Sequence, residues 1–340
     1  MAAILLLLAA AVAAPVPAPP PLVRQWEAKA PESLASFEPL KGGFAGASAN
    51  EKAEWQPIET YAEACQKAAR EAVRAELKPL GFEAAALPPG TYRDRTCRAA
   101  STLYSLARPA MTWAAFEAAL REAWPVYSAY LAAVDNAEGV ADEGLHAETA
   151  ALGAAEARPN LRAALPARIV GEQVLRLGLN SSGGGESLSP GARAILRALF
   201  WDAIARRDHA NTDWLKAEVE RSGWPTNSAV GKAAAGKAWL LVQHADDDPA
   251  FQARVLRLMA PLAARGEVSK HDYALLYDRV MLKVAGHQRY GTQFECRGGR
   301  FEPRPLEDPA RVEQWRKTAG LDTLAENGAR INRENPNLCR

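Results

Sequence analysis

The sequence predicts a mainly α fold, in which multi-helix, bundle-like domains carry one small β-hairpin near residues 289–303. Three observations lead to this prediction. About a fifth of the chain is alanine, the strongest helix former. Apolar residues recur at spacings of three and four along most of the sequence, which is the period of a helix with one buried face. Capping residues, several of them followed by proline, precede many of these runs, where helices begin.

Composition narrows the function classes. The chain has 340 residues, 48% of them hydrophobic, which is enough to bury a large core in one big domain or two ordinary ones. This apolar content argues against intrinsic disorder. The 41 basic and 40 acidic residues leave a net charge of +1. A phosphate backbone therefore meets no bulk positive field, and we expect no nucleic-acid partner.

The N-terminus predicts export. Residues 4–14 form a short apolar stretch that includes the small-x-small triplet Ala-Val-Ala at residues 11–13, as secretory signals do near their cleavage sites. We therefore assign residues 1–14 to a signal peptide and expect a periplasmic or extracellular protein. The alternative is an incorrectly assigned start, because no Lys or Arg precedes Arg24. Later in the chain no stretch approaches the ~20 apolar residues of a membrane span.

The N-terminal half is predicted to contain a linker followed by helices. Residues 15–55 are rich in Pro, Ala and Gly and predict an extended, mobile tether. Residues 56–180 predict a helical region, whose clearest run places seven apolar residues on one helical face. Pro125 within this run predicts a kink or a break. The run comprises Trp113, Phe116, Leu120, Trp124, Tyr127, Leu131 and Val134.

A second helical domain is predicted over residues 190–325. A stretch rich in Gly and Ser, at about residues 180–190, is the best internal boundary. After Gly286 the helical period ends, and the segment that follows predicts the hairpin of residues 289–303. We assign residues 326–340 to a tail.

The four cysteines predict disulfides. They are Cys65, Cys97, Cys296 and Cys339, and no C-x-x-C pair occurs among them, so zinc-ribbon and thioredoxin-type sites have no support. In an oxidising compartment an even number of cysteines indicates disulfide bonds. Three pairings are possible, and the most economical joins Cys65 to Cys97 and Cys296 to Cys339. Free buried thiols are the alternative.

One group of polar residues in the second half is a candidate for chemistry. An apolar helix ends in Gln243, His244 and Asp246, and a buried polar group costs about 1–3 kcal/mol unless it finds a partner. Candidate partners lie on a later helix, which carries Asp278 and Arg279, and in the loop after it. That loop supplies Gln288, Tyr290, Thr292 and Gln293. Such a combination of side chains is typical of a site for a small polar ligand.

Four sequence blocks resemble a known family. They are Trp224-Pro225-Thr226, Gln243-His244-Ala245-Asp246, the Tyr-Ala-Leu-Leu-Tyr-Asp-Arg run at 273–279 and the Gln-Arg-Tyr-Gly-Thr-Gln run at 288–293. Their order and spacing resemble a bacterial domain family of unknown function over residues 190–325. Because that family has no established activity, the resemblance indicates where a site lies and not what it does. At residues 320–324 the chain departs from the pattern, which predicts that the last helix docks differently.

Each candidate also has a structural interpretation. His244 is the best general base by side-chain type, with Asp246 or Asp278 to orient its ring, and a core histidine satisfied by Gln or Asp is the alternative. Arg279 can bind a carboxylate or a phosphate, or Asp278 and Arg279 can be internal ion-pairing groups, which is the interpretation that we favour. Tyr290 can donate to a substrate or hold the hairpin against the helices.

Two hypotheses follow for the function, and we favour the first. The first is an exported module that binds a small polar ligand or a peptide. The second is an envelope hydrolase or transferase with His244 as general acid/base and Arg279 stabilising anionic charge, although no G-x-S-x-G motif is present. No cofactor is predicted, and no metal, because the spacing of His244 and Asp246 has low specificity even with His271 added. The residues assigned to ligand binding are Gln243, Arg279, Gln288, Tyr290 and Gln293, and the catalytic candidates are His244, Asp246 and Asp278.

Overall fold

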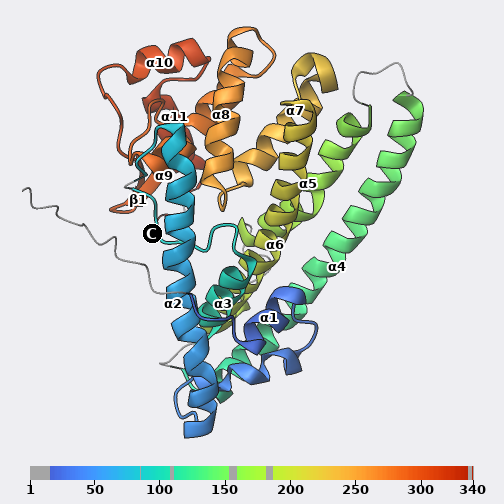
Figure 1. The fold of residues 1–340 in the computed structure, drawn as a ribbon, viewed down its shortest axis with the longest axis vertical. Coiled ribbons are helices and arrows are strands. Elements are labelled where there is room, and N and C mark those ends of the chain that lie inside the picture. Colours follow the sequence, from blue (N-terminus) through green and yellow to red (C-terminus); the bar gives the residue numbers. More distant parts are fainter. Residues whose placement is uncertain are drawn as a thin grey trace, which may run out of the picture.

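Figure 1 shows the chain as a computed structural model. The structure describes residues 16–84, 86–107, 111–152, 159–180, 187–335 and 339. Within these ranges the fold is mainly α with one two-stranded β-hairpin, as the sequence predicts. The predicted signal peptide and residues 181–186 of the predicted internal boundary lie outside the described residues.

The N-terminal part forms a set of short and long helices. They are α1 (Pro21–Ala28), the 3₁₀ helix η1 (Leu34–Gly43), α2 (Ala49–Leu77), the 3₁₀ helix η2 (Lys78–Leu80) and α3 (Arg95–Leu106). Ser48 caps α2, because its hydroxyl accepts a hydrogen bond from the amide of Glu51, and the Glu51 carboxylate accepts one from the Ser48 amide in return. This capping box satisfies two amides that a helix end would otherwise leave unpaired, and it fixes where α2 begins.

Three long helices follow. They are α4 (Trp113–Leu152), α5 (Pro159–Asn180) and α6 (Pro190–Ser222), and α5 packs against both of the others (Figure 1). Pro125 lies inside α4, which continues through it, so the predicted break does not occur. Phe116 and Tyr127 are almost completely buried on either side of the proline. Burial of one continuous apolar face keeps the helix together across the lost backbone hydrogen bond.

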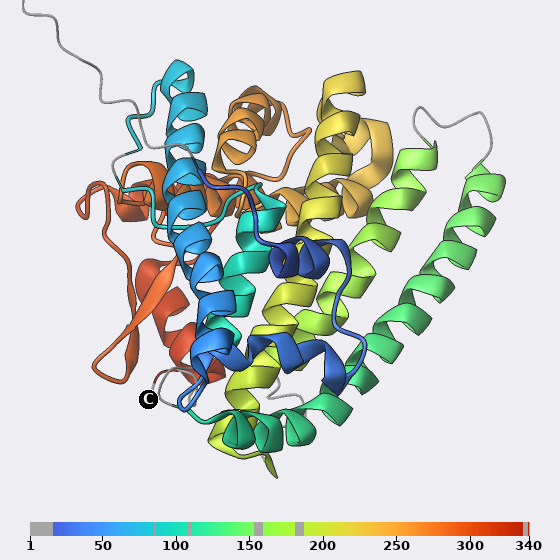
Figure 2. The same cartoon turned by 60° about the horizontal axis from the view of Figure 1, so that its bottom comes forward.

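Residues 21–55 are folded, in contrast to the tether predicted for residues 15–55. Phe37 and Leu40 are fully buried, and the Phe37 ring lies 5.8 Å from that of Trp124 on α4. Figure 2 shows this segment, in dark blue, lying over the long helices. The composition suggested a mobile chain, but composition does not reveal that a few apolar side chains fit between distant helices.

The C-terminal part contains three helices, the hairpin and two final helices. They are α7 (Asn227–His244), α8 (Pro249–Ala264), α9 (Lys270–Val284), β1 (Phe294–Arg297), β2 (Arg300–Pro303), α10 (Val312–Ala319) and α11 (Leu324–Glu334). The strands pair antiparallel, with Cys296 opposite Phe301, which confirms the predicted hairpin. Gly298 and Gly299 form the two-residue turn, and both have positive φ, as this tight hairpin turn requires.

Residues 324–334 form a helix, whereas the sequence assigned residues 326–340 to a tail. Thr323 caps α11 through the amide of Glu326. The Asn332 side chain donates to the carbonyl oxygen of Phe301 and accepts from its amide, which joins α11 to β2. The prediction failed because α11 is held by polar contacts and carries few apolar residues, so no buried stripe marks it in the sequence.

Two clusters of buried apolar side chains form the core. One gathers α1 to α6, and the other gathers α7, α8 and α9 with parts of the earlier helices. The helices α2, α5 and α6 contribute side chains to both clusters, so the N-terminal helices pack directly on the C-terminal ones. None of the described helices has the length and apolar character needed to cross a membrane.

Both predicted disulfides are present. Cys65 and Cys97 join α2 to α3, and Cys296 and Cys339 join β1 to the C-terminal end. Their presence is compatible with export to an oxidising compartment.

Candidate functional site

His244, the last residue of α7, pairs with a carboxylate that the sequence analysis did not consider. Its Nδ1 lies 2.9 Å from Oε1 of Glu172 on α5. Glu172 is 1% exposed, and its carboxylate also accepts hydrogen bonds from Gln173 and Arg176. Glu172, from the N-terminal part of the chain, therefore orients the imidazole of His244, and the predicted partners Asp246 and Asp278 do not.

Arg176 connects this pair to a second carboxylate. Its Nη2 donates to Oδ2 of Asp208 on α6 at 2.7 Å, whereas Oδ1 of Asp208 is buried and accepts no hydrogen bond from the described residues. Burial raises the pKa of Asp208 well above its ordinary value, although Arg176 opposes this. Burial works in the same direction at Glu172, but the bonds from His244 and Arg176 hold the pKa of Glu172 below its ordinary value. We call Glu172, Arg176, Asp208 and His244 the histidine–carboxylate cluster.

Asp246 lies just beyond α7 and is bound by two cations of α9. Arg279 donates to its carboxylate from Nε at 2.8 Å and from Nη2, and Lys283 donates to the same carboxylate. Surrounding protein atoms disfavour the charged form, but Lys283 and Arg279 hold the pKa of Asp246 well below its ordinary value. Lys283 also donates to Oε1 of Gln252. Arg279 is thus part of an internal ion pair, as we favoured, but its partner is Asp246 and not Asp278.

Asp278 is fully buried and holds the loop that follows α9. Its Oδ1 accepts hydrogen bonds from the amides of Arg289 at 2.8 Å and Tyr290 at 2.9 Å, and its Oδ2 accepts from the amide of Thr292 at 2.8 Å. A carboxylate with three backbone donors fixes the path of the chain. The geometry therefore gives Asp278 a structural task and not that of a catalytic base.

Gln288 and Tyr290 also shape this loop. The buried Gln288 amide donates to the carbonyl oxygens of Gln293 and Arg304, and it accepts from the Gln293 amide, so it joins the loop to the end of β2. The Tyr290 ring packs edge-on against Tyr277 of α9 with centroids 5.7 Å apart. These contacts match the structural interpretation of Tyr290, in which it holds the hairpin against the helices.

Arg279 and Gln293 meet in an open cavity of about 300 Å³ beside the hairpin, which we call the arginine cleft. The residues that line it are Ala86, Pro88, Asp246, Arg279, Leu282, Lys283, Gln293 and Arg304. Arg304 is 46% exposed, with its Nε 3.6 Å from Glu295. Nη1 of Arg279 makes no hydrogen bond to any residue that the structure describes. The cleft therefore offers two guanidinium groups with donors available to a ligand.

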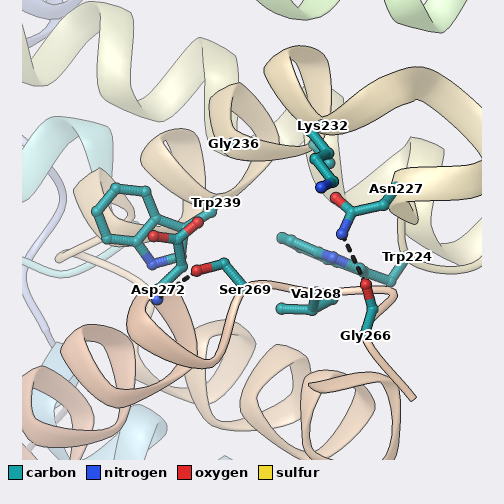
Figure 3. Close-up of a pocket in the computed structure, with 10 residues that line it drawn as sticks. Trp224, Asn227, Lys232, Gly236, Trp239, Gly266, Val268, Ser269 and Asp272 are labelled. Carbon is teal, nitrogen blue, oxygen red and sulfur yellow. Dashed lines mark hydrogen bonds between the residues drawn. The ribbon is translucent and has the colours of Figure 1, made fainter. Parts of the chain in front are cut away.

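A second cavity, of about 280 Å³, lies between the start of α7 and the start of α9, and we call it the tryptophan cavity. Figure 3 shows Trp239 and Asp272 on one side of it and Lys232, Asn227 and Trp224 on the other. Nε1 of Trp239 is buried without a hydrogen-bond partner in the described part of the chain. Trp224 belongs to one of the four sequence blocks, but the sequence analysis assigned no ligand-binding role to this cavity.

Gln243 stands apart from both cavities. It is 8% exposed, and its Oε1 has no hydrogen-bond partner among the residues described. Neither cavity is lined by Gln243 or by its neighbour His244. The other predicted site residues divide into the histidine–carboxylate cluster, the loop held by Asp278 and the arginine cleft.

Glu172, Asp208 and Arg176 are not among the site residues predicted from the sequence, although the sequence contains one signal for them. Glu172 follows Leu165 and Ile169 at helical spacings of four and three, on the buried face of α5. A charged residue in an apolar stripe must find a partner inside the protein, because an unpaired buried charge is costly. Such a residue marks a polar cluster, but it does not identify the partners.

Comparison with known proteins relates the second half of the chain to one protein family. No curated protein and no solved structure matches the chain. The arginine cleft, the tryptophan cavity and the loop held by Asp278 draw most of their residues from the last 150 positions, whereas Glu172 and Arg176 precede them. This C-terminal part, from residue 195 to residue 334, matches the model of a family of unknown function (DUF6624), and it confirms the resemblance seen in the sequence.

Proposed function

We propose that this exported protein binds a small anionic ligand, carrying a carboxylate or a phosphate, in the arginine cleft. The observation that carries the proposal is the charge of the lining. Arg279, Lys283 and Arg304 outnumber the single carboxylate of Asp246, so the cleft has an excess of positive charge. Guanidinium groups bind carboxylates and phosphates through parallel hydrogen bonds, and an exposed cleft of one charge sign attracts ligands of the other.

The ion pair with Asp246 preorganises Arg279 for ligand binding. Two of its nitrogens are bound to Asp246, which holds the guanidinium in one orientation while Nη1 stays available. A ligand therefore does not have to immobilise this side chain when it binds, and that part of the entropic cost is avoided. Lys283 differs, because its ammonium already donates to Asp246 and Gln252.

The size of the cleft limits the ligand. Ligand pockets in proteins span about 300–1,000 Å³, and the arginine cleft, at about 300 Å³, lies at the lower end. A small dicarboxylate, a phosphorylated small molecule or the terminal carboxylate of a peptide fits this limit. Gln293 adds an amide that can hydrogen-bond the uncharged part of such a ligand.

Isothermal titration with succinate and with inorganic phosphate tests the proposal. We expect Arg304→Ala to weaken binding about 10-fold or more, as the loss of a charge-assisted hydrogen bond implies. Arg304 is well exposed, so this variant should fold normally. Lys232→Ala is the matched control, because it removes one cation from the tryptophan cavity instead. Absence of binding by the wild type, or equal losses in both variants, would contradict the proposal.

A second function, hydrolysis or group transfer with His244 as general base, has one observation in its favour. The 2.9 Å contact with Glu172 holds Nδ1 of His244 and leaves Nε2 to accept a proton. The imidazole is, however, 14% exposed and lines neither cavity, so we rank this function second. Turnover of p-nitrophenyl acetate by the wild type, lost in His244→Gln, would favour it over simple binding.

A further inference from the structure

Three metal-ligating side chains converge from three helices in the histidine–carboxylate cluster. Glu172 of α5, Asp208 of α6 and His244 of α7 each place one ligand atom within 4.8 Å of the other two. One imidazole nitrogen and two carboxylate oxygens are ligands that zinc takes in proteins. Ligand atoms around a tetrahedral zinc lie roughly 3.4 Å apart, given bonds of about 2.1 Å. To reach this geometry, no pair of ligand atoms has to approach by more than roughly 1.4 Å.

In the deprotonated form that binds a metal, the cluster carries one negative charge that Arg176 does not balance. Arg176 is shared between the carboxylates of Glu172 and Asp208. With the imidazole neutral, as metal binding requires, one carboxylate charge has no cation. Arg279 and Lys283 pair with Asp246 and not with the carboxylates of this cluster. A buried cluster with an uncompensated negative charge favours the binding of a divalent cation.

One carboxylate oxygen of the cluster, Oδ1 of Asp208, lacks a hydrogen-bond partner in the described part of the chain. This oxygen is also buried. Buried polar atoms are almost always paired in folded proteins, and an unpaired one commonly marks a missing ion or water.

Arg176 binds one oxygen of each carboxylate, Oε2 of Glu172 and Oδ2 of Asp208. Of the other two oxygens, Oδ1 of Asp208 has no donor among the described residues, and Oε1 of Glu172 contacts Gln173 and His244. An ion in place of the proton shared by Nδ1 of His244 and Oε1 of Glu172 would keep both arginine bonds. Carboxylates that bind metals are commonly oriented by such outer partners.

We propose that Glu172, Asp208 and His244 bind a zinc ion that ties α5 to α6 and α7. The ion would be structural, since none of the three residues lines either cavity. Glu172 precedes the family-matched segment, whereas Asp208 and His244 lie within it. The site therefore fastens the N-terminal helices to the C-terminal domain. The sequence predicts no metal, because His244 with Asp246 and His271 forms a pattern of low specificity and Glu172 and Asp208 lie far from His244 in the chain.

Zinc titration of the full-length protein, first stripped with EDTA, tests the site. All four cysteines are in disulfides, so an oxidised preparation offers no thiolate to the metal. We expect one zinc per chain with a Kd tighter than about 10 µM. Asp208→Asn keeps the shape of the side chain and should weaken binding by more than the about 10–100-fold that losing a supporting partner costs.

His209→Gln is the matched control. His209 directly follows Asp208 and pairs with Asp247 at 2.7 Å, so this variant removes a second histidine–carboxylate pair, with a buried imidazole, outside the proposed site. It should bind zinc within about 3-fold of the wild type, a difference too small for a lost ligand. No zinc binding by the wild type, or equal losses in Asp208→Asn and His209→Gln, overturns the proposal.

X-ray absorption of the zinc-loaded wild type gives a readout that does not depend on how any variant folds. The proposal expects a first coordination sphere of nitrogen and oxygen atoms with a single imidazole. A spectrum with two or more imidazoles would place the ion elsewhere, for example with His209, and would overturn it.

Discussion

Replacing Asp278 with Asn tests whether this carboxylate holds the loop after α9. Asp278 accepts three backbone hydrogen bonds, from the amides of Arg289, Tyr290 and Thr292. Asparagine has nearly the same shape, but one of its two terminal groups donates instead of accepting. If the asparagine oxygen keeps the two bonds to Arg289 and Tyr290, its NH₂ group faces the amide of Thr292. Two donors then confront each other inside the protein.

The expected cost follows from these contacts. One charge-assisted hydrogen bond, worth about 1.5–3 kcal/mol, is lost, and one buried amide donor is left unpaired at about 1–3 kcal/mol. The two contributions overlap. Burial raises the pKa of Asp278, although the three amides oppose it, so a neutral side chain also recovers part of the desolvation cost. We therefore expect the free energy of unfolding to fall by about 2–3 kcal/mol.

Urea denaturation, followed by circular dichroism, measures this loss. Asp272→Asn on the same helix is the control, because Asp272 lies in the first turn of α9, is partly solvent-exposed and should cost less than about 1 kcal/mol. A value for Asp278→Asn within about 0.5 kcal/mol of the wild type would refute the structural task of Asp278. In that case the asparagine would hold the loop through a different set of hydrogen bonds.

Three further predictions concern the stability of the fold, and each is measured as a change in the free energy of unfolding. Asp202→Ala leaves the buried Arg98 without its closest carboxylate, and we expect a loss of about 3–5 kcal/mol; a loss below 1 kcal/mol would show that Arg98 finds another partner. Replacing Cys296 and Cys339 with Ser together opens a loop closed at a separation of 43 residues, which should cost about 4 kcal/mol, and an unchanged midpoint would contradict this. Gly291→Ala should cost about 1–3 kcal/mol, because φ is +64° and the new Cβ would lie 2.6 Å from Leu324, and a stability equal to the wild type would speak against this close contact.

The helices and the hairpin could be predicted because they depend on local signals. Ser189, Asp248 and Ser269 each accept a hydrogen bond from an amide in the first turn of the helix that follows. Gly298 and Gly299 mark the hairpin turn, since two adjacent residues with positive φ favour glycine. Each of these features is decided within a few residues, so a single sequence contains the information.

The folded N-terminal segment and the partner of His244 could not be predicted, because both depend on contacts between distant parts of the chain. Glu172 and His244 are 72 positions apart, and nothing near His244 indicates which carboxylate will reach it. Proximity in sequence suggested Asp246, but residues two positions apart do not share a helix face. Phe37 likewise packs against Trp124 of α4, a residue far from it in the sequence.

A crystal structure of the protein soaked in saturating succinate tests whether the arginine cleft binds a small anion. We expect a succinate carboxylate within hydrogen-bond distance of Nη1 of Arg279 and of the Arg304 guanidinium, with the Asp246–Arg279 pair intact. Succinate bound in the tryptophan cavity beside Lys232, with none in the arginine cleft, would contradict it.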